Sequence, residues 1–177
     1  VRFYEHSGID FIALGRAVVK RGLMGQKSAG GGSTITQQLA KQLFTEKAHS
    51  VAERLMQKPI EWVIAVQLER TYTKDEIIAL YLNYFDFLHN AVGIKTASNT
   101  YFGKDPKNLS VNEAATLIGL CKNPSYFNPV RHPERCVERR NVVLAQMEKA
   151  GYLSASHCDS LSNLPLGLNF HVSDHKD

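Results

Sequence analysis

Glycines, hydroxyls, paired amides and a lysine follow one another in the stretch Gly30–Lys41, which reads GGGSTITQQLAK. On a helix from Thr34 to Phe44, one polar face would carry Thr34, Gln37, Gln38 and Lys41. A helix start offers unpaired N–H donors and partial positive charge, glycines let a ligand approach the backbone, and lysine adds a full charge. The pattern therefore outlines a site for an anion such as pyrophosphate. The alternative is a capped surface helix after a flexible loop.

A second candidate is Glu61, a carboxylate directly before the apolar run 62–66. A carboxylate in such a helix is costly unless it meets a cation, a hydrogen-bond donor or a water-filled cleft. Gln57 and Lys58 lie one helical turn before Glu61. Two interpretations stay open: a functional carboxylate in a cleft, or a structural salt bridge with Lys58 or Arg54.

The elements that position these residues are predicted to be helices. The expected helices are a short basic amphipathic one over Ile9–Lys20, one from Ser33 or Thr34 to about Phe44, a nearly all-apolar and buried one that ends near Arg70, one from Thr73 to Asn83 with a capping box, one from Val111 to Leu120, and one over Pro133–Lys149. The glycine-rich stretch Gly22–Gly32 favours a mobile flap. Few segments alternate with a period of two, so strands are scarce and the fold class is mainly α.

Composition sets further limits on the function. The 177 residues suit one folded domain, with 44% apolar and 21% charged residues and a net charge of +4 that fits an anionic partner. Three cysteines, without a C-x-x-C pair, disfavour a disulfide framework or a metal site and are expected to act as small buried hydrophobes. The basic run 131–140 contains glutamates, which favours a salt-bridged helix face over nucleic-acid binding.

Five blocks with a distinctive order run through the chain. They are Phe3, His6, Gly8 and Asp10 of a Phe-x-x-His-x-Gly-x-Asp pattern; Gly31–Leu39 of Gly-x-Ser-Thr-x-Thr-Gln-Gln-Leu, followed by Lys41; Gln57–Glu61 of Arg-Lys-x-x-Glu; Ile77–Asn83, continued by Ala91–Ile94 and Tyr101–Gly103; and Ala114–Leu120 with Asn123–Pro129. Together they resemble the peptidoglycan glycosyltransferase (transglycosylase) domain of class A penicillin-binding proteins, glycosyltransferase family 51. The resemblance covers nearly the whole chain.

This resemblance implies a lysozyme-like helical fold with a larger globular lobe and a smaller membrane-proximal lobe. It implies that residues 1–168 form the glycosyltransferase domain, truncated at its N-terminal end. Residues 169–177 would begin a linker toward a transpeptidase domain.

The activity implied by the resemblance is polymerisation of lipid II into β-1,4-linked glycan strands, with inversion and release of undecaprenyl pyrophosphate. Lys41, Arg54 and Lys58 would carry the charge of the leaving group. Ser33, Thr34, Gln37 and Gln38 would line the substrate cleft. Glu61 matches the family's second glutamate, which would organise the cations, the pyrophosphate or a divalent ion. No cofactor is required, although Mg²⁺ or Mn²⁺ fits this chemistry, and no metal ligand is assigned.

Two departures from the family pattern bear on catalysis. The glutamate that serves as general base in the first block would lie before Val1, outside this chain. Gln57 stands where the family pattern has arginine, which makes Arg54 the candidate for that charge. Two alternatives to the polymerase remain: a lysozyme-like lytic glycosidase, and a fragment that binds lipid II or moenomycin without polymerising it.

The resemblance also implies a location. The segment with Phe11, Ile12, Leu14, Val18 and Val19, next to Arg16, Lys20 and Arg21, would contact the outer leaflet of the bacterial inner membrane from its extracytoplasmic face. A membrane anchor would lie upstream of this chain. Expected partners are lipid II, the growing glycan strand and moenomycin-type inhibitors, and no nucleic acid.

Overall fold

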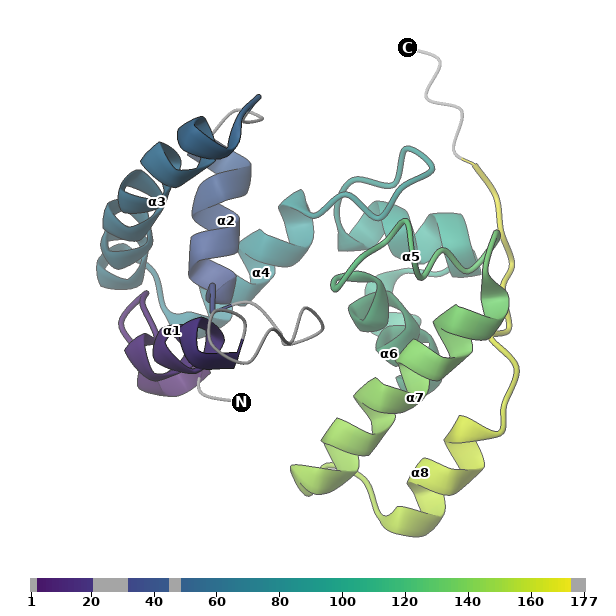
Figure 1. The fold of residues 1–177 in the computed structure, drawn as a ribbon. Coiled ribbons are helices and arrows are strands. Elements are labelled where there is room, and N and C mark those ends of the chain that lie inside the picture. Colours follow the sequence, from purple (N-terminus) through teal and green to yellow (C-terminus); the bar gives the residue numbers. More distant parts are fainter. Residues whose placement is uncertain (1–2, 21–31, 45–48, 173–177) are drawn as a thin grey trace. The chain divides into compact units, whose positions relative to one another are not determined.

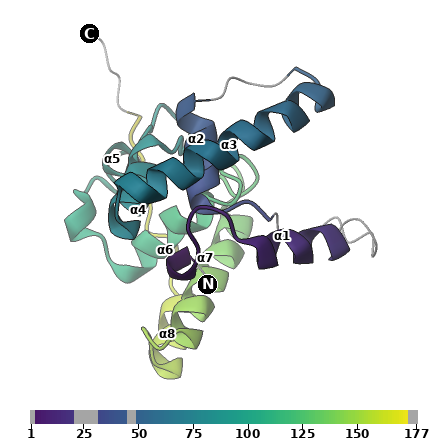
Figure 2. The same cartoon turned by 90° about the vertical axis from the view of Figure 1, so that its left-hand side faces the viewer.

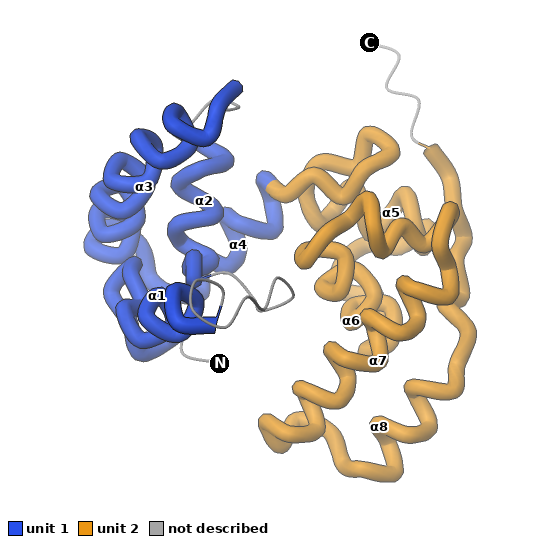
Figure 3. Tube along the Cα trace, viewed as in Figure 1, with its two compact units in different colours: residues 1–84 blue, residues 85–177 orange. Residues whose placement is uncertain are grey.

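The chain folds into helices that gather in two compact units, Val1–Tyr84 and Phe85–Asp177 (Figure 3). The structure, a computed structural model, describes residues 3–20, 32–44 and 49–172. The flap predicted at Gly22–Gly32 therefore lies outside the described residues, except for Gly32. Because the described secondary structure is helical, the mainly α fold predicted from the sequence is confirmed. None of the described helices is both long and apolar enough to cross a membrane.

Unit 1 places α2 against both α3 and α4. Its elements are the 3-10 turn η1 (Phe3–Glu5), α1 (Phe11–Val18), α2 (Ile35–Phe44), α3 (Val51–Thr71) and α4 (Lys74–Tyr84) (Figure 1). Figure 2 looks onto α3 where it crosses α2, with α1 to one side. The core of this unit lies between these helices and contains Leu39, Ala65, Ile77 and Tyr81.

Side-chain caps explain where these helices begin. Asp10 accepts the Ala13 N–H at 2.9 Å and starts α1. Thr73 and Glu76 bond reciprocally at the start of α4, which confirms the capping box predicted there. Each cap satisfies backbone donors that the helix itself leaves open, so the sequence fixes these starting points locally.

The prediction that the apolar helix is buried is wrong. Helix α3 runs through Pro59, which lacks the N–H that a helix interior normally uses. Among its residues Glu61, Ala65 and Leu68 are buried, whereas Ile60 and Val63 are exposed. The apolar residues of α3 lie on more than one of its sides, whereas the rest of unit 1 packs against a single stripe along it.

Unit 2 is built around the pair α6 and α7. Its elements are α5 (Ile94–Phe102), the 3-10 turn η3 (Pro106–Asn108), α6 (Val111–Leu120), α7 (Pro133–Lys149) and α8 (Ala155–Ser162). Ala115, Leu144 and Cys158 form a core cluster that joins α6, α7 and α8. The starts of α6 and α7 agree with the prediction from the sequence. Helices α5 and α8 are present in the structure but were not predicted from the sequence.

The segment after α8 returns along unit 2. Backbone N–H groups of Asn169 and His171 donate to the carbonyls of Tyr101 and Thr100 at 2.9 and 2.8 Å. The first residues of the segment predicted as a linker therefore bond to the end of α5. A linker beyond them, toward a transpeptidase domain, stays a prediction.

The cysteines of unit 2 behave as apolar side chains. Cys136 and Cys158 are buried and Cys121 is half-buried. Burial raises the pKa of Cys121 to about 12 and that of Cys136 to about 11. At neutral pH these two thiols stay protonated, in agreement with the structural role predicted for the cysteines.

A candidate anion-binding pocket

The start of α2 is a reciprocal cap formed by Thr34 and Gln37. The Gln37 N–H donates to Thr34 Oγ1 at 3.1 Å, and the Thr34 N–H donates to Gln37 Oε1 at 3.0 Å. The Thr34 hydroxyl also donates to the carbonyl of Gly8 at 2.7 Å. This arrangement assigns the cap to Thr34, one of two residues that the sequence allows, and it engages Gln37 through its side-chain oxygen.

The polar residues beside this cap divide between surface and core. Ser33, which precedes α2, and Gln38 and Lys41 of α2 lie at the surface, while Thr36, Leu39 and Ala40 are buried. This alternation is the amphipathic pattern expected for the segment. Gln38 Oε1 accepts a 3.3 Å hydrogen bond from the hydroxyl of Tyr81, a buried residue of α4. Tyr81 thus orients one of the paired amides.

The second side of the site is a charge triad on α3. Glu61 is 1% exposed, and its two oxygens lie 2.5 Å from Arg54 Nη1 and 2.7 Å from Lys58 Nζ. Arg54 also donates to Gln57 Oε1 at 3.2 Å. Because α3 continues through Pro59, Arg54, Lys58 and Glu61 share one helix face. Both structural salt bridges considered for Glu61 are therefore present.

The two sides meet in one pocket of about 270 Å³. It is lined by Ser33, Gln37, Gln38, Lys41, Arg54, Lys58 and Glu61. The lining contains three basic side chains, Lys41, Arg54 and Lys58, and the carboxylate of Glu61. The structure thus brings together every residue predicted for the site except Thr34, which is buried beside the pocket and bonded to the backbone. A role for Thr34 in binding substrate stays a prediction.

A divalent metal finds few protein ligands in this pocket. Glu61 is the one carboxylate among the described residues that line it, and both of its oxygens already contact cations. No cluster of three or more acidic, histidine or cysteine ligands occurs within the described part of the chain. The protein residues present do not form a Mg²⁺ or Mn²⁺ site by themselves, so we derive no step through a metal.

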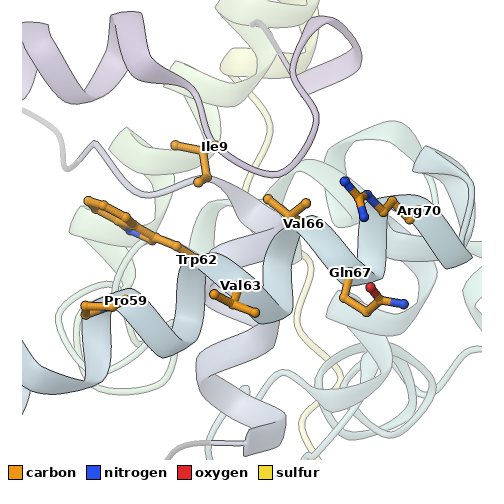
Figure 4. A pocket seen from close by; sticks show the side chains of 7 residues that line it. All are labelled: Ile9, Pro59, Trp62, Val63, Val66, Gln67 and Arg70. Carbon is orange, nitrogen blue, oxygen red and sulfur yellow. The ribbon is translucent and has the colours of Figure 1, made fainter.

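Unit 1 has a second, apolar hollow of about 440 Å³ along the same helix (Figure 4). Its lining residues are Ile9, Pro59, Trp62, Val63, Val66, Gln67 and Arg70. Figure 4 shows Trp62 and Val66 beside Ile9, which precedes α1, with Arg70 at the far end of the row. Helix α3 therefore contributes residues to both a charged pocket and an apolar hollow.

Two neighbours of the pocket are absent from the predicted set. Tyr81 lies within the family block Ile77–Asn83, but neither spacing nor the motif shows that its hydroxyl bonds Gln38. Gln57 is visible as a departure from the motif, and the structure makes it a partner of Arg54. Contacts between residues on different helices are the information that the sequence lacks.

Comparisons with known proteins agree with the resemblance. The sequence model of the family described as "Transglycosylase" matches residues 1–148. The chain is 44% identical to penicillin-binding protein 1F of Bacillus subtilis over 95% of this chain and 23% of the relative. It is 40% identical to penicillin-binding protein 1A of Escherichia coli over 98% of this chain and 20% of the relative. The chain thus spans about a fifth of the length of these curated relatives.

A solved structure supports the fold. The crystal structure of penicillin-binding protein 1A from Haemophilus influenzae matches 76% of this chain and 17% of its own chain, with a TM-score of 0.52 and 30% identity. The family match covers residues 1–148, and the solved structure has the same mainly helical fold. The chain therefore belongs to the transglycosylase family.

Proposed function

We propose that this chain is a peptidoglycan glycosyltransferase domain that polymerises lipid II into β-1,4-linked glycan strands. The observation that carries the proposal is the pocket lined by three cations, Lys41 of α2 and Arg54 and Lys58 of α3, together with the carboxylate of Glu61. A glycosyl donor on a lipid pyrophosphate releases an anion with several charges, and such an anion needs fixed cations and donors. Membership of the transglycosylase family supports the same reaction class.

In this reaction the pocket holds the leaving group. Lys58 and Arg54 are fixed by Glu61, so their charges are already in place when negative charge develops on the departing pyrophosphate. Gln37 and Ser33 add donors at the helix start. Attack by the acceptor hydroxyl from the opposite side inverts the anomeric carbon and expels undecaprenyl pyrophosphate. Glu61 acts in this scheme by positioning cations.

The general base of the proposal is the glutamate that the family resemblance places before Val1. Glu5 is the nearest carboxylate in the described N-terminal segment, in the exposed turn η1, and it does not line the pocket. A base must reach the acceptor hydroxyl within hydrogen-bond distance. For this reason the assay belongs in the full-length gene product that contains this chain.

The membrane surface is the second partner of the proposal. Helix α1 exposes Phe11, Ile12 and Val18, and Arg16 lies on the same short helix. Exposed apolar groups beside a cation suit an anionic lipid surface. We place the domain at the extracytoplasmic face of the bacterial inner membrane, anchored by a segment outside this chain. Retention by anionic liposomes at low salt tests this contact, and a chain that does not sediment with them contradicts it.

The assay for the activity uses labelled lipid II and the full-length gene product. We expect glycan strands to grow, and we expect Glu61→Gln and Lys58→Gln to lower the rate about 10²-fold to 10³-fold, because each disturbs preorganised charge. Lys104→Gln is the matched control, because it breaks the 2.7 Å ion pair with Glu113 in unit 2. Moenomycin-type inhibitors are expected to block growth.

Other outcomes of the same assay separate the alternatives. A lytic glycosidase would shorten preformed glycan, and it has no pyrophosphate for three cations to stabilise. A binding-only protein would retain lipid II without extending it. Either result from the full-length gene product would overturn the polymerase proposal.

A further inference from the structure

Glu69, in the last turns of α3, is a buried carboxylate that does not line the polar pocket. Its side chain is 5% exposed. Its Oε1 accepts a 2.6 Å hydrogen bond from the Thr36 hydroxyl, and its Oε2 lies 2.7 Å from Nζ of Lys74. Thr36 belongs to α2 and Lys74 begins α4, so one carboxylate joins three helices of unit 1.

Lys74 also holds the N-terminal segment. Its Nζ donates to the carbonyl of His6 at 2.5 Å and lies 4.5 Å from the ring centre of Phe3. The Gly8 N–H donates to Nδ1 of His6 at 3.2 Å, and the same nitrogen lies 3.8 Å from Glu69 Oε1. Nζ of Lys74 approaches Glu69 more closely, at 2.7 Å. Lys74 is the cation that compensates Glu69.

A second tether fixes the same segment at Gly8. The Thr34 hydroxyl donates to the Gly8 carbonyl at 2.7 Å. Gly8 has a φ of +97°, and a Cβ there would lie 2.9 Å from backbone atoms of Ala65 in α3. Residues 6–8 are thus attached to α4 through Lys74, to α2 through Thr34, and to α3 by direct backbone packing.

This network ties the N-terminal segment to the start of α2, where Ser33 and Gln37 line the polar pocket. Thr36 lies in the first turn of α2, next to Gln37 of the pocket. Buried ion pairs give little net stability compared with apolar side chains of the same volume, but their directional bonds fix positions. Positions matter for transfer reactions, because a displacement of about 1 Å in a reacting group can cost about 10²-fold in rate.

We infer that Thr36, Glu69 and Lys74 are positioning residues of the glycosyl transfer. They hold the N-terminal segment at a fixed position relative to the start of α2. The acceptor, on the side of the N-terminal segment, and the leaving group, on the side of α2, then face each other at a fixed distance. This inference rests on the proposed function, since it assigns one reactant to each side of the network. None of the three residues lines the pocket itself.

The test compares paired substitutions in the full-length gene product. Thr36→Val and Lys74→Met remove the hydroxyl and the cation with little change in volume, whereas Thr36→Ser and Lys74→Arg keep them. We expect kcat with labelled lipid II to fall about tenfold to hundredfold in the first pair, with recovery in Thr36→Ser. Binding of a fluorescent lipid pyrophosphate should change by less than about twofold, because the pocket is intact. Lys104→Met is the control for loss of a lysine–glutamate pair.

Each outcome supports or overturns the inference. Parent-like kcat in Lys74→Met overturns it, and so does a parallel loss of kcat and binding that follows the folded fraction in thermal melts. If Lys74→Met does not fold, Thr36→Val and Thr36→Ser decide, because they differ in rate only if the hydroxyl bond to Glu69 sets a position. A parent protein that makes no glycan overturns the proposed function instead.

Discussion

Replacing Arg140 by methionine removes a guanidinium that is 0% exposed and fastens the segment after α8 to α7. The guanidinium donates to the carbonyls of Leu164 at 2.8 Å, Ser162 at 3.0 Å and Pro165 at 3.2 Å. Burial lowers the pKa of Arg140, although arginine stays charged at neutral pH. Its Nε also donates to Asn141 Oδ1 at 3.0 Å. Three main-chain carbonyls and one amide oxygen therefore compensate the charge of Arg140, and no ion pair to Arg140 is found in the described part of the chain.

The expected loss of stability depends on which hydrogen bonds each carbonyl keeps after the substitution. Ser162 and Pro165 each retain a 3.2 Å hydrogen bond from an asparagine amide after the substitution. Leu164 retains none among the described hydrogen bonds, and a hydrogen bond from a charged donor is worth about 1.5–3 kcal/mol. The substitution also removes the bond to Asn141 Oδ1, leaves Ser162 and Pro165 with one bond each, and relieves one buried charge, so we expect a net loss of about 3 kcal/mol. That corresponds to a fall of roughly 6–12 °C in melting temperature.

Far-UV circular dichroism measures the melting temperature, and hydrogen exchange with mass spectrometry reads the local effect. The amides of Asn169 and His171 should exchange faster in Arg140→Met, because the chain before them is released. Arg139→Met is the control: Arg139 is half-buried and donates one 3.3 Å bond, to Gly119, so we expect a loss below about 1 kcal/mol. Equal losses in both variants, or unchanged exchange at residues 169–171, would refute this reasoning.

Three further predictions concern the fold. Gly8→Ala should destabilise unit 1 by more than about 1 kcal/mol in urea melts, because φ is +97° and the new Cβ would meet the α3 backbone; Gly15→Ala, where nothing lies within 4 Å, is the control. Burial would raise the pKa of Glu113, but hydrogen bonds, chiefly from Lys104, lower it below its ordinary 4.5. The contribution of Glu113 to the free energy of unfolding is therefore complete above pH 4.5, and it is lost as pH falls through the lower pKa of the folded state. In Glu113→Gln the free energy of unfolding should fall less over this acid range, and an unchanged pH dependence would contradict the role given to Glu113. Cys121 and Cys136 should react slowly with a thiol reagent at pH 8 until the chain is denatured, since their pKa values are about 12 and 11, and rapid native-state labelling would show that they are accessible thiolates.

Local signals in the sequence predict much of this fold. The reciprocal bonds of Thr73 with Glu76, and of Ser110 with Glu113, involve residues three apart, so the pattern alone reveals them. The polar pocket is predictable for a similar reason. Gln37 and Lys41 are one turn apart on α2, as are Lys58 and Glu61 on α3, and the family blocks connect the two helices.

Features that depend on packing escape sequence reasoning. Helix α5 reads IKTASNTYF, and its β-branched and hydroxyl residues favour other structures, yet Tyr101 and Phe102 are buried and hold it in place. Helix α3 misleads in the opposite way, because apolar residues suggest burial that unit 1 does not provide. The Thr36–Glu69 bond spans 33 residues, and no periodicity can reveal a contact of that length.

The apolar hollow on α3 also gives the protein an optical property. Trp62 is the single tryptophan of the sequence and lines that hollow. Intrinsic fluorescence excited at the indole band therefore reports on one place in unit 1, without contributions from other indoles. An amphiphile that enters the hollow would exclude water from the ring and move its emission to shorter wavelength, so occupancy can be followed without any label.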